Sequence, residues 1–191
     1  MAAEEQMDQA EPSLASWILG WIPWIAGALI ITVLVRAFVG EAYIIPTGSM
    51  LDTIQLDDRV WGEKLSYKFR EPEQGEIIMF ATPTGEDYTL VKRVIAVGGQ
   101  TVDLVDGHVV VDGETLDEPY TGGKESWPLA EQLAGVGPLT YPYTVPEGHV
   151  WVMGDNRTNS RDSRYFGPVS VDAVQARAVF TFWPLSDVRW L

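Results

Sequence analysis

The chain has 191 residues, enough for one compact domain with a small appendage and too few for several catalytic domains. Its 13 Lys and Arg against 27 Asp and Glu give a formal charge of −14, which argues against nucleic acid as a partner because Lys and Arg hold phosphates. The chain has no cysteine, which excludes disulfides, Cys-ligated zinc, iron–sulfur clusters and thiol nucleophiles. Its 46% hydrophobic residues can form a substantial core.

An uncharged apolar segment dominates the amino-terminal part of the chain. The 24 residues of segment 12–35 carry no charge, and at about 1.5 Å per residue they can cross a hydrocarbon core of about 30 Å. Three tryptophans within residues 17–24 recur at spacings that place them on one helical face, where indoles favour the headgroup level. The acidic leading tail differs from the basic start of a signal peptide. We predict a short acidic tail at residues 1–13 and a retained transmembrane helix at residues 14–39.

The charges beside this helix say little about its orientation. The tail before it contains no Lys or Arg, whereas Arg36 follows the apolar segment directly. Under the positive-inside rule, this single charge places the carboxyl-terminal side inside. One residue is too little to decide the orientation, which stays open at this point.

The remaining residues, 40–191, have the pattern of a mostly β domain. Short β-branched and aromatic runs alternate with turn residues, and Asp-Gly pairs flank one of these runs on both sides. We predict strands at 58–61, 76–80, 90–97, 101–105, 108–111, 149–153 and 176–183, and short helices at 63–69 and 127–133. The strands should be antiparallel and form a sandwich or irregular barrel. The Gly- and Pro-rich residues of about 114–147 should form a small inserted cap.

Elimination leaves serine and lysine as candidate catalytic residues. The only two histidines, His108 and His149, lie in predicted strands, and no metal-ligand spacing is present. Among the four lysines only Lys92 lies within an apolar strand, on the face that Leu90, Val94 and Ala96 share. Burial lowers the pKa of a lysine and would make Lys92 a general base near neutral pH. A lysine that protects a sheet edge or pairs with a nearby carboxylate has the same pattern, so this alternative stays open.

The serine that fits this base is Ser49, in the sequence Ile-Pro-Thr-Gly-Ser-Met. Pro46 stops an extended apolar run and Gly48 allows a tight turn, so Ser49 can project from a strand end. The Thr47 hydroxyl can donate into an oxyanion hole together with the Ser49 backbone N–H. A plain turn has a similar composition. Ser49 follows Arg36 by 13 residues, so it lies within about 40 Å of the membrane face even if the chain is fully extended.

A dense polar segment at residues 154–167 completes the pattern. Its alternating Asp and Arg could close as ion pairs beside a catalytic group. The chain thus contains Ile-Pro-Thr-Gly-Ser-Met, a strand with Lys-Arg, and Gly-Asp-Asn-Arg followed by Asp-Ser-Arg, in that order. In these motifs it resembles the type I signal peptidases, membrane-anchored Ser/Lys endopeptidases, from the anchor through Trp183.

The resemblance implies a role for individual residues. Ser49 would be the nucleophile, Lys92 the general base and Thr47 the side-chain donor of the oxyanion hole. Ser160 would hydrogen-bond and orient Lys92. The residues that would support the site are Gly154, Asp155, Asn156, Asp162 and Arg164. The candidates for the substrate pocket are Ile44, Ile45 and Met50. Neither a metal nor another cofactor is expected.

The resemblance also implies the reaction and its location. The chain would cleave signal peptides from exported preproteins after a small residue, typically at an Ala-x-Ala site, through an acyl-enzyme on Ser49. It would be a monomer in the lipid bilayer of the plasma membrane, with a cytoplasmic tail and an extracytoplasmic catalytic domain. This orientation is opposite to the one that Arg36 alone indicates. Two residues depart from the family pattern: Asp52, where a proline is usual, and Gln100, where an aspartate is usual.

Two other functions stay open. The first is another Ser/Lys peptidase of related fold, such as a self-cleaving SOS repressor, which the anchor and the lack of a DNA-binding segment disfavour. The second is an inactive membrane-tethered β domain that binds secretion machinery. A preprotein cleavage assay distinguishes the second from a signal peptidase.

Overall fold

The computed structural model describes residues 14–191, so the predicted acidic tail at residues 1–13 lies outside the described residues. The chain divides into two units, Met1–Ala37 and Phe38–Leu191.

The described residues of the first unit form one long helix. Helix α1 (Leu14–Leu34) is followed by a π-helical segment, Val35–Val39. Residues Trp17–Val39 are long and apolar enough to cross a membrane, and their large apolar side chains are exposed. The rings of Trp17 and Trp21 meet edge to face with centroids 5.9 Å apart, as their one-turn spacing predicts.

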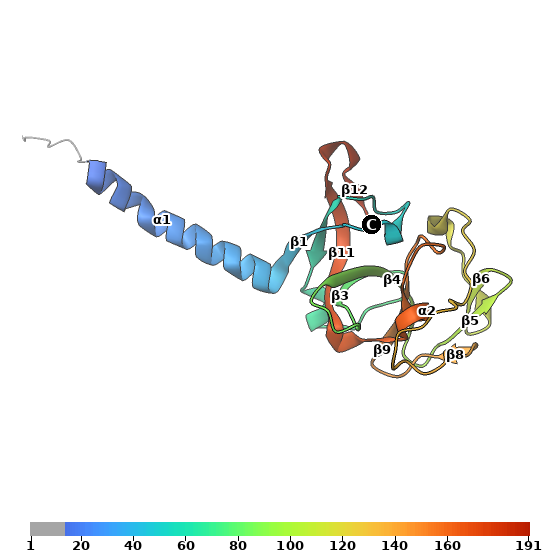
Figure 1. Cartoon of the computed structure of the whole chain (residues 1–191). Coiled ribbons are helices and arrows are strands. Elements are labelled where there is room, and N and C mark those ends of the chain that lie inside the picture. Colours follow the sequence, from blue (N-terminus) through green and yellow to red (C-terminus); the bar gives the residue numbers. More distant parts are fainter. Residues whose placement is uncertain (1–13) are drawn as a thin grey trace, which may run out of the picture. The chain divides into compact units, whose positions relative to one another are not determined.

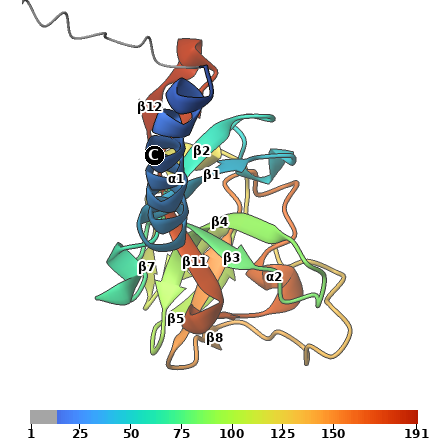
Figure 2. The same ribbon diagram turned by 90° about the vertical axis from the view of Figure 1, so that its left-hand side faces the viewer.

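The second unit contains two antiparallel sheets (Figure 1). The larger sheet has the strand order β1-β2-β11-β3-β4-β9-β10, and β12 pairs with β11. Its strands are β1 (Gly40–Ile44), β2 (Arg59–Glu63), β3 (Ile77–Ala81), β4 (Thr89–Val97), β9 (His149–Met153), β10 (Val169–Ser170), β11 (Val174–Trp183) and β12 (Arg189–Trp190). The smaller sheet has the order β7-β6-β5-β8, with β5 (Thr101–Val105), β6 (His108–Val111), β7 (Glu114–Thr115) and β8 (Tyr143–Thr144). Figure 2 shows β11, β3 and β4 side by side.

The structure confirms the mostly β, antiparallel fold and all seven predicted strands. The strands predicted at 101–105, 108–111 and 149–153 have the predicted bounds, and the others differ by at most two residues at either end. The turns explain this agreement for the hairpins around β6. Both residues of each flanking Asp-Gly pair have positive φ, which is the geometry of a two-residue hairpin turn.

Neither predicted helix forms as an α-helix. In the first, β2 extends to Glu63, and only a 3₁₀ turn, Ser66–Lys68, follows. The Glu63 carboxylate accepts hydrogen bonds from the backbone N–H and the hydroxyl of Ser66, which closes this turn without a longer helix. The second, at 127–133, contains no helix.

The backbone of residues 127–133 bonds outside its own segment. Its partners belong to the short helix α2 (Ser163–Phe166), which begins at the N-cap Asp162. The Trp127 carbonyl accepts from Arg164, and the Leu133 N–H donates to the Tyr165 carbonyl. Because these groups are satisfied by α2, the segment does not need helical hydrogen bonds of its own.

Residues of about 114–147, predicted as an inserted cap, contribute to the smaller sheet at both ends. Strand β7 pairs with β6, and β8 pairs with β5. Between them lies irregular chain with a 3₁₀ turn, Pro119–Thr121. The limits of the cap stay a prediction.

Strand β4 connects the two halves of the core. It pairs with β3 on one side and with β9 on the other, where a bulge lies between Val94 and Ala96. Leu90 and Val94 pack in one core cluster, whereas Ala96 packs with its neighbour Ile95 in another. The prediction that Ala96 shares a face with Leu90 and Val94 is therefore wrong, because the bulge breaks the alternation of the strand.

Candidate active site

Ser49 lies in a turn that the polar segment holds in place. A 3₁₀ turn, Gly48–Met50, follows the extended residues after β1. Asn156 binds this turn twice, because its backbone N–H donates to the Ser49 carbonyl at 3.1 Å and its side-chain amide donates to the Gly48 carbonyl at 2.9 Å. A Cβ at Gly154 would overlap the Ser49 carbonyl oxygen, so the close approach of the two segments requires glycine there. The predicted support from Gly154 and Asn156 thus has a direct geometric basis.

Lys92 reaches Ser49 from β4. Its Nζ lies 2.7 Å from Ser49 Oγ and 3.0 Å from the Val91 carbonyl oxygen, to which it donates. The side chain is 2% exposed, and no ion pair to it is found within residues 14–191. Burial lowers the pKa of Lys92 to about 8, although the charges of Asp162 and Asp155 act in the opposite direction. A lysine in this environment can lose its proton near neutral pH and accept the proton of a serine.

Two predicted roles involve hydroxyl groups that form no hydrogen bond to the dyad in the structure. Thr47 is exposed and lies at the rim of both cavities that reach Ser49. The Ser160 hydroxyl is buried, and in the described part of the chain it has no hydrogen-bond partner, since Lys92 bonds to Ser49 and Val91 instead. The oxyanion role of Thr47 and the orienting role of Ser160 stay predictions.

The expected ion pairs of the polar segment form, although not all between the expected partners. Arg164 binds Asp162 through Nε at 2.8 Å and Nη2 at 2.9 Å. Asp155 instead pairs with Arg93, the residue after Lys92, through two hydrogen bonds of 2.9 and 2.7 Å. Asp162 also accepts from the Gly154 N–H at 3.1 Å. These carboxylates therefore fix both the strand that carries Lys92 and the segment that holds the Ser49 turn.

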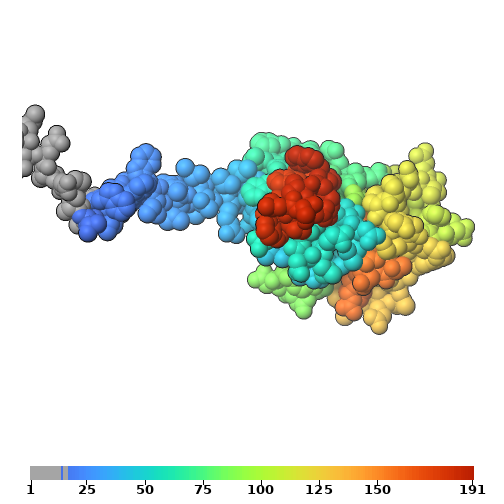
Figure 3. All heavy atoms as spheres, turned by 90° about the horizontal axis from the view of Figure 1, so that it is seen from above, coloured from blue at the N-terminus to red at the C-terminus, as the bar shows by residue number. Residues whose placement is uncertain are grey.

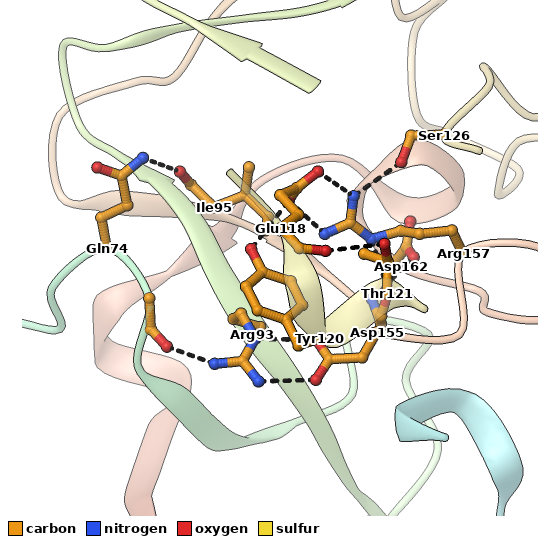
Figure 4. A network of polar contacts seen from close by, with 12 residues as sticks. Gln74, Arg93, Ile95, Glu118, Tyr120, Thr121, Ser126, Asp155, Arg157 and Asp162 are labelled. Carbon is orange, nitrogen blue, oxygen red and sulfur yellow. Dashed lines mark hydrogen bonds and ion pairs between the residues drawn. The ribbon is translucent and has the colours of Figure 1, made fainter. Parts of the chain in front are cut away.

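The network extends to residues that sequence reasoning missed (Figure 4). Arg157 is buried and binds the Glu118 carboxylate through both terminal nitrogens, at 2.9 and 2.6 Å. It also donates to the Ser126 hydroxyl at 2.7 Å. The Tyr120 ring centroid lies 4.0 Å from the Arg93 guanidinium and 5.9 Å from that of Arg157. Glu118 and Arg157 are 39 residues apart, and no local sequence pattern links them.

A second missed contact joins the last strand to the turn after Ser49. Arg189 of β12 donates twice to the Thr53 carbonyl, at 3.2 and 2.7 Å, and once to the buried carboxylate of Asp58 at 2.9 Å. The Thr53 hydroxyl in turn donates to Asp155. In Figure 3 the red carboxyl-terminal residues lie against the cyan segment that follows Ser49.

Both departures from the family pattern have local hydrogen-bond partners. The exposed Asp52 carboxylate pairs with Lys124 at 3.2 Å, and its backbone carbonyl accepts from the Gln55 side chain. Gln100 accepts from the Val97 N–H at 3.0 Å and donates to Asp112 at 3.0 Å, so it caps the turn after β4.

Two cavities reach Ser49. The larger, of about 420 Å³, is mainly apolar and lies between the residues around β1 and the start of β4. The predicted pocket residues Ile44, Ile45 and Met50 all line it. The smaller, of about 200 Å³, is lined by Ser49 and Lys92 together with the exposed Asn159 and Arg161.

Comparison with known proteins identifies the family of the chain. The family model for signal peptidase, peptidase S26, matches residues 18–183. Probable signal peptidase I-1 of Synechocystis sp. is 40% identical over 94% of this chain and 88% of its own length. Signal peptidase IB of Staphylococcus aureus is 33% identical over 91% of this chain and 93% of its own length. A crystal structure of a signal peptidase I from Enterococcus faecalis V583 aligns with a TM-score of 0.45 and 32% identity, over 56% of this chain and 96% of that one. The sequence matches favour neither the repressor-like peptidase nor the inactive binding domain.

Proposed function

The chain belongs to the signal peptidase, peptidase S26 family, and from this premise we propose which of its residues carry out the reaction. It is a serine endopeptidase that cleaves signal peptides from preproteins. Ser49 is the nucleophile and Lys92 the general base. The observation that carries this assignment is the 2.7 Å contact between Lys92 Nζ and Ser49 Oγ, with the lysine buried and its pKa lowered.

The reaction proceeds in two steps. Neutral Lys92 takes the proton of the Ser49 hydroxyl while Oγ attacks the scissile carbonyl carbon. The oxyanion of the tetrahedral intermediate accepts hydrogen bonds from the Thr47 hydroxyl and the Ser49 N–H. The C–N bond then breaks, Lys92 returns its proton to the leaving amine, and an acyl ester remains on Ser49. A water molecule, deprotonated by Lys92, hydrolyses this ester. Ser160 orients the Lys92 amine throughout.

The apolar cavity holds the residues before the cut. An extended peptide laid along a strand edge presents alternate side chains to the protein, and a cavity shared among several of them accepts only small ones. Ile44, Ile45 and Met50 line this cavity and fit small apolar side chains such as alanine.

The chain acts at a membrane as a monomer. Helix α1 spans the plasma membrane, with the acidic tail in the cytoplasm and the catalytic domain outside it. The absence of cysteine allows a direct test, because a single cysteine can be introduced at Glu5 or at Ser186 and labelled with an impermeant maleimide in intact cells. Labelling of Ser186→Cys but not Glu5→Cys supports this orientation, and the reverse pattern contradicts it. Light scattering of the detergent-solubilised chain measures its oligomeric state.

A cleavage assay tests the catalytic assignment. The full chain in detergent is incubated with a preprotein, and the new amino terminus is determined. We expect one cut after a small residue at the end of the apolar segment. Ser49→Ala and Lys92→Met should abolish it, whereas the surface controls Ser186→Ala and Lys68→Met should not. Full activity of either site variant would exclude the Ser/Lys dyad.

A further inference from the structure

Arg161 lies at the rim of the smaller cavity. The other three arginines in and beside the polar segment are each neutralised: Arg93 by Asp155, Arg157 by Glu118 and Arg164 by Asp162. Arg161 is exposed, and its guanidinium lies over the Tyr165 ring, 5.1 Å from the centroid. Within residues 14–191, no carboxylate forms an ion pair with it.

The position of Arg161 relative to Ser49 and Lys92 indicates which part of the substrate it meets. Both cavities touch Ser49, but only the smaller one is lined by Lys92. Under the proposed function, Lys92 must deliver its proton to the leaving amine, so the residues after the cut leave on the side of Lys92. The residues before the cut occupy the apolar cavity. The peptide therefore passes Arg161 just after the scissile bond.

Among the described residues, Arg161 is the only side chain lining the smaller cavity that carries a permanent positive charge. The only other cationic side chain lining this cavity is Lys92, which has to be neutral to act as a base. Two carboxylates, Glu86 and Glu131, line neighbouring cavities that Arg161 also borders, and neither of these cavities contains Ser49 or Lys92. A carboxylate on the departing peptide can therefore approach the guanidinium without displacing a carboxylate already paired with it.

We propose that Arg161 is a specificity-determining residue that favours substrates with an acidic side chain at the first or second position after the scissile bond. This inference rests on the proposed function. Because Arg161 is exposed, we expect about a fivefold preference in kcat/KM for an acidic over a neutral residue, as for a partly exposed ion pair. Salt should weaken the preference.

The test uses preproteins that are identical up to the cut and carry Asp-Asp, Asn-Asn or Lys-Lys directly after it. The wild-type chain should cleave the Asp-Asp substrate about five times faster than the Asn-Asn substrate. In Arg161→Gln the two rates should become equal, and Arg161→Glu should prefer Lys-Lys. The matched control is Arg59→Gln, because Arg59 is an exposed arginine that stacks on Trp183 at 5.8 Å. It should keep the wild-type preference.

The outcomes distinguish a failure of the Arg161 proposal from a failure of the proposed function. If the wild type cleaves the Asp-Asp and Asn-Asn substrates equally well, or if Arg161→Gln keeps the preference, Arg161 does not determine specificity, although the proposed function stands. If the wild type cleaves no preprotein, the proposed function fails and this inference fails with it.

Discussion

Two neighbouring residues of β4 occupy opposite electrostatic environments. Lys92 is 2% exposed and has no ion pair among the described residues, so its amine lies between a serine hydroxyl and one backbone carbonyl. Arg93 is 9% exposed, yet it has two hydrogen bonds to Asp155, a third to the Gly75 carbonyl and the face of Tyr120. Lys92 thus lacks a counter-ion, whereas its neighbour Arg93 has a carboxylate, a backbone carbonyl and an aromatic ring as partners.

This difference separates catalysis from stability. A buried charge without a partner is costly, and this cost lowers the pKa of Lys92 to about 8, so the amine can lose its proton near neutral pH. The guanidinium cannot release a proton at any relevant pH, and its carboxylate partner offsets the cost instead. A change at Lys92 should therefore appear mainly in the reaction rate, and a change in the Arg93 ion pair mainly in stability.

The largest effect should follow from making position 92 resemble position 93. Lys92→Arg places a permanent cation beside Ser49 and removes the base, so kcat should fall by about 10⁴-fold or more. Steady-state cleavage of a preprotein measures the loss. Lys68→Arg, an exposed lysine changed in the same way, should keep full activity. Substantial turnover by Lys92→Arg would mean that another group deprotonates Ser49.

Breaking the ion pair between Arg93 and Asp155 should lower the stability of the protein. Asp155→Asn leaves the Arg93 guanidinium buried without its counter-ion, so the free energy of unfolding should fall by about 3–5 kcal/mol. Urea unfolding of the detergent-solubilised chain, followed by tryptophan fluorescence, measures this change. Asp52→Asn, which removes an exposed carboxylate, should change it by less than about 1 kcal/mol. Equal small effects of both variants would contradict the distinction between the two regions.

Thr47→Val should lower activity and leave stability nearly unchanged. The substitution removes a hydroxyl from an exposed position at the cavity rim, so stability should hardly change. The lost oxyanion donor should lower kcat by about 10²–10³-fold. Thr47→Ser keeps the hydroxyl and should keep most of the activity. If Thr47→Val were as active as the wild type, the oxyanion would have to be held by backbone N–H groups alone.

The smallest effect should be a graded dependence on pH. Because the pKa of Lys92 is lowered to about 8, kcat/KM should rise about tenfold per pH unit below that value and level off above it. The unfolded chain keeps this proton up to a higher pH than the folded chain does. Unfolding therefore takes up a proton between these two pKa values, and the stability of the wild type relative to Lys92→Met should rise with pH in that window. A rate independent of pH between 6 and 9, or a relative stability that falls with rising pH, would contradict a neutral buried lysine.

The parts of the molecule that could be predicted are those with a local cause. The strands flanked by Asp-Gly pairs have the expected limits because each turn depends on two adjacent residues. Likewise, Ser49 and Lys92 could be singled out as a pair because few residue types in this chain can form a nucleophile and a base. The structure brings the two side chains together, and their catalytic roles stay a prediction. The helix expected at 127–133 failed because the backbone there bonds to a segment more than 30 residues away.

The partners of the buried arginines could not be predicted for the same reason. Arg93 and Asp155 are separated by 62 residues, and Arg157 and Glu118 by 39. Alternating charges within the polar segment indicated pairs inside it, and this holds only for Asp162 with Arg164. Which distant carboxylate meets which arginine depends on strand order, and local sequence does not encode strand order.

The position of β11 also bears on when the larger sheet can form during synthesis. In the larger sheet β11 lies between β2 and β3, although it follows both in the chain by about a hundred residues. Until the ribosome has released residues 174–183, the strands near Ser49 and those near Lys92 have no common neighbour, and Arg189 cannot yet support Thr53. Residues 174–183 must therefore be synthesised before β2 and β3 can be joined in the larger sheet.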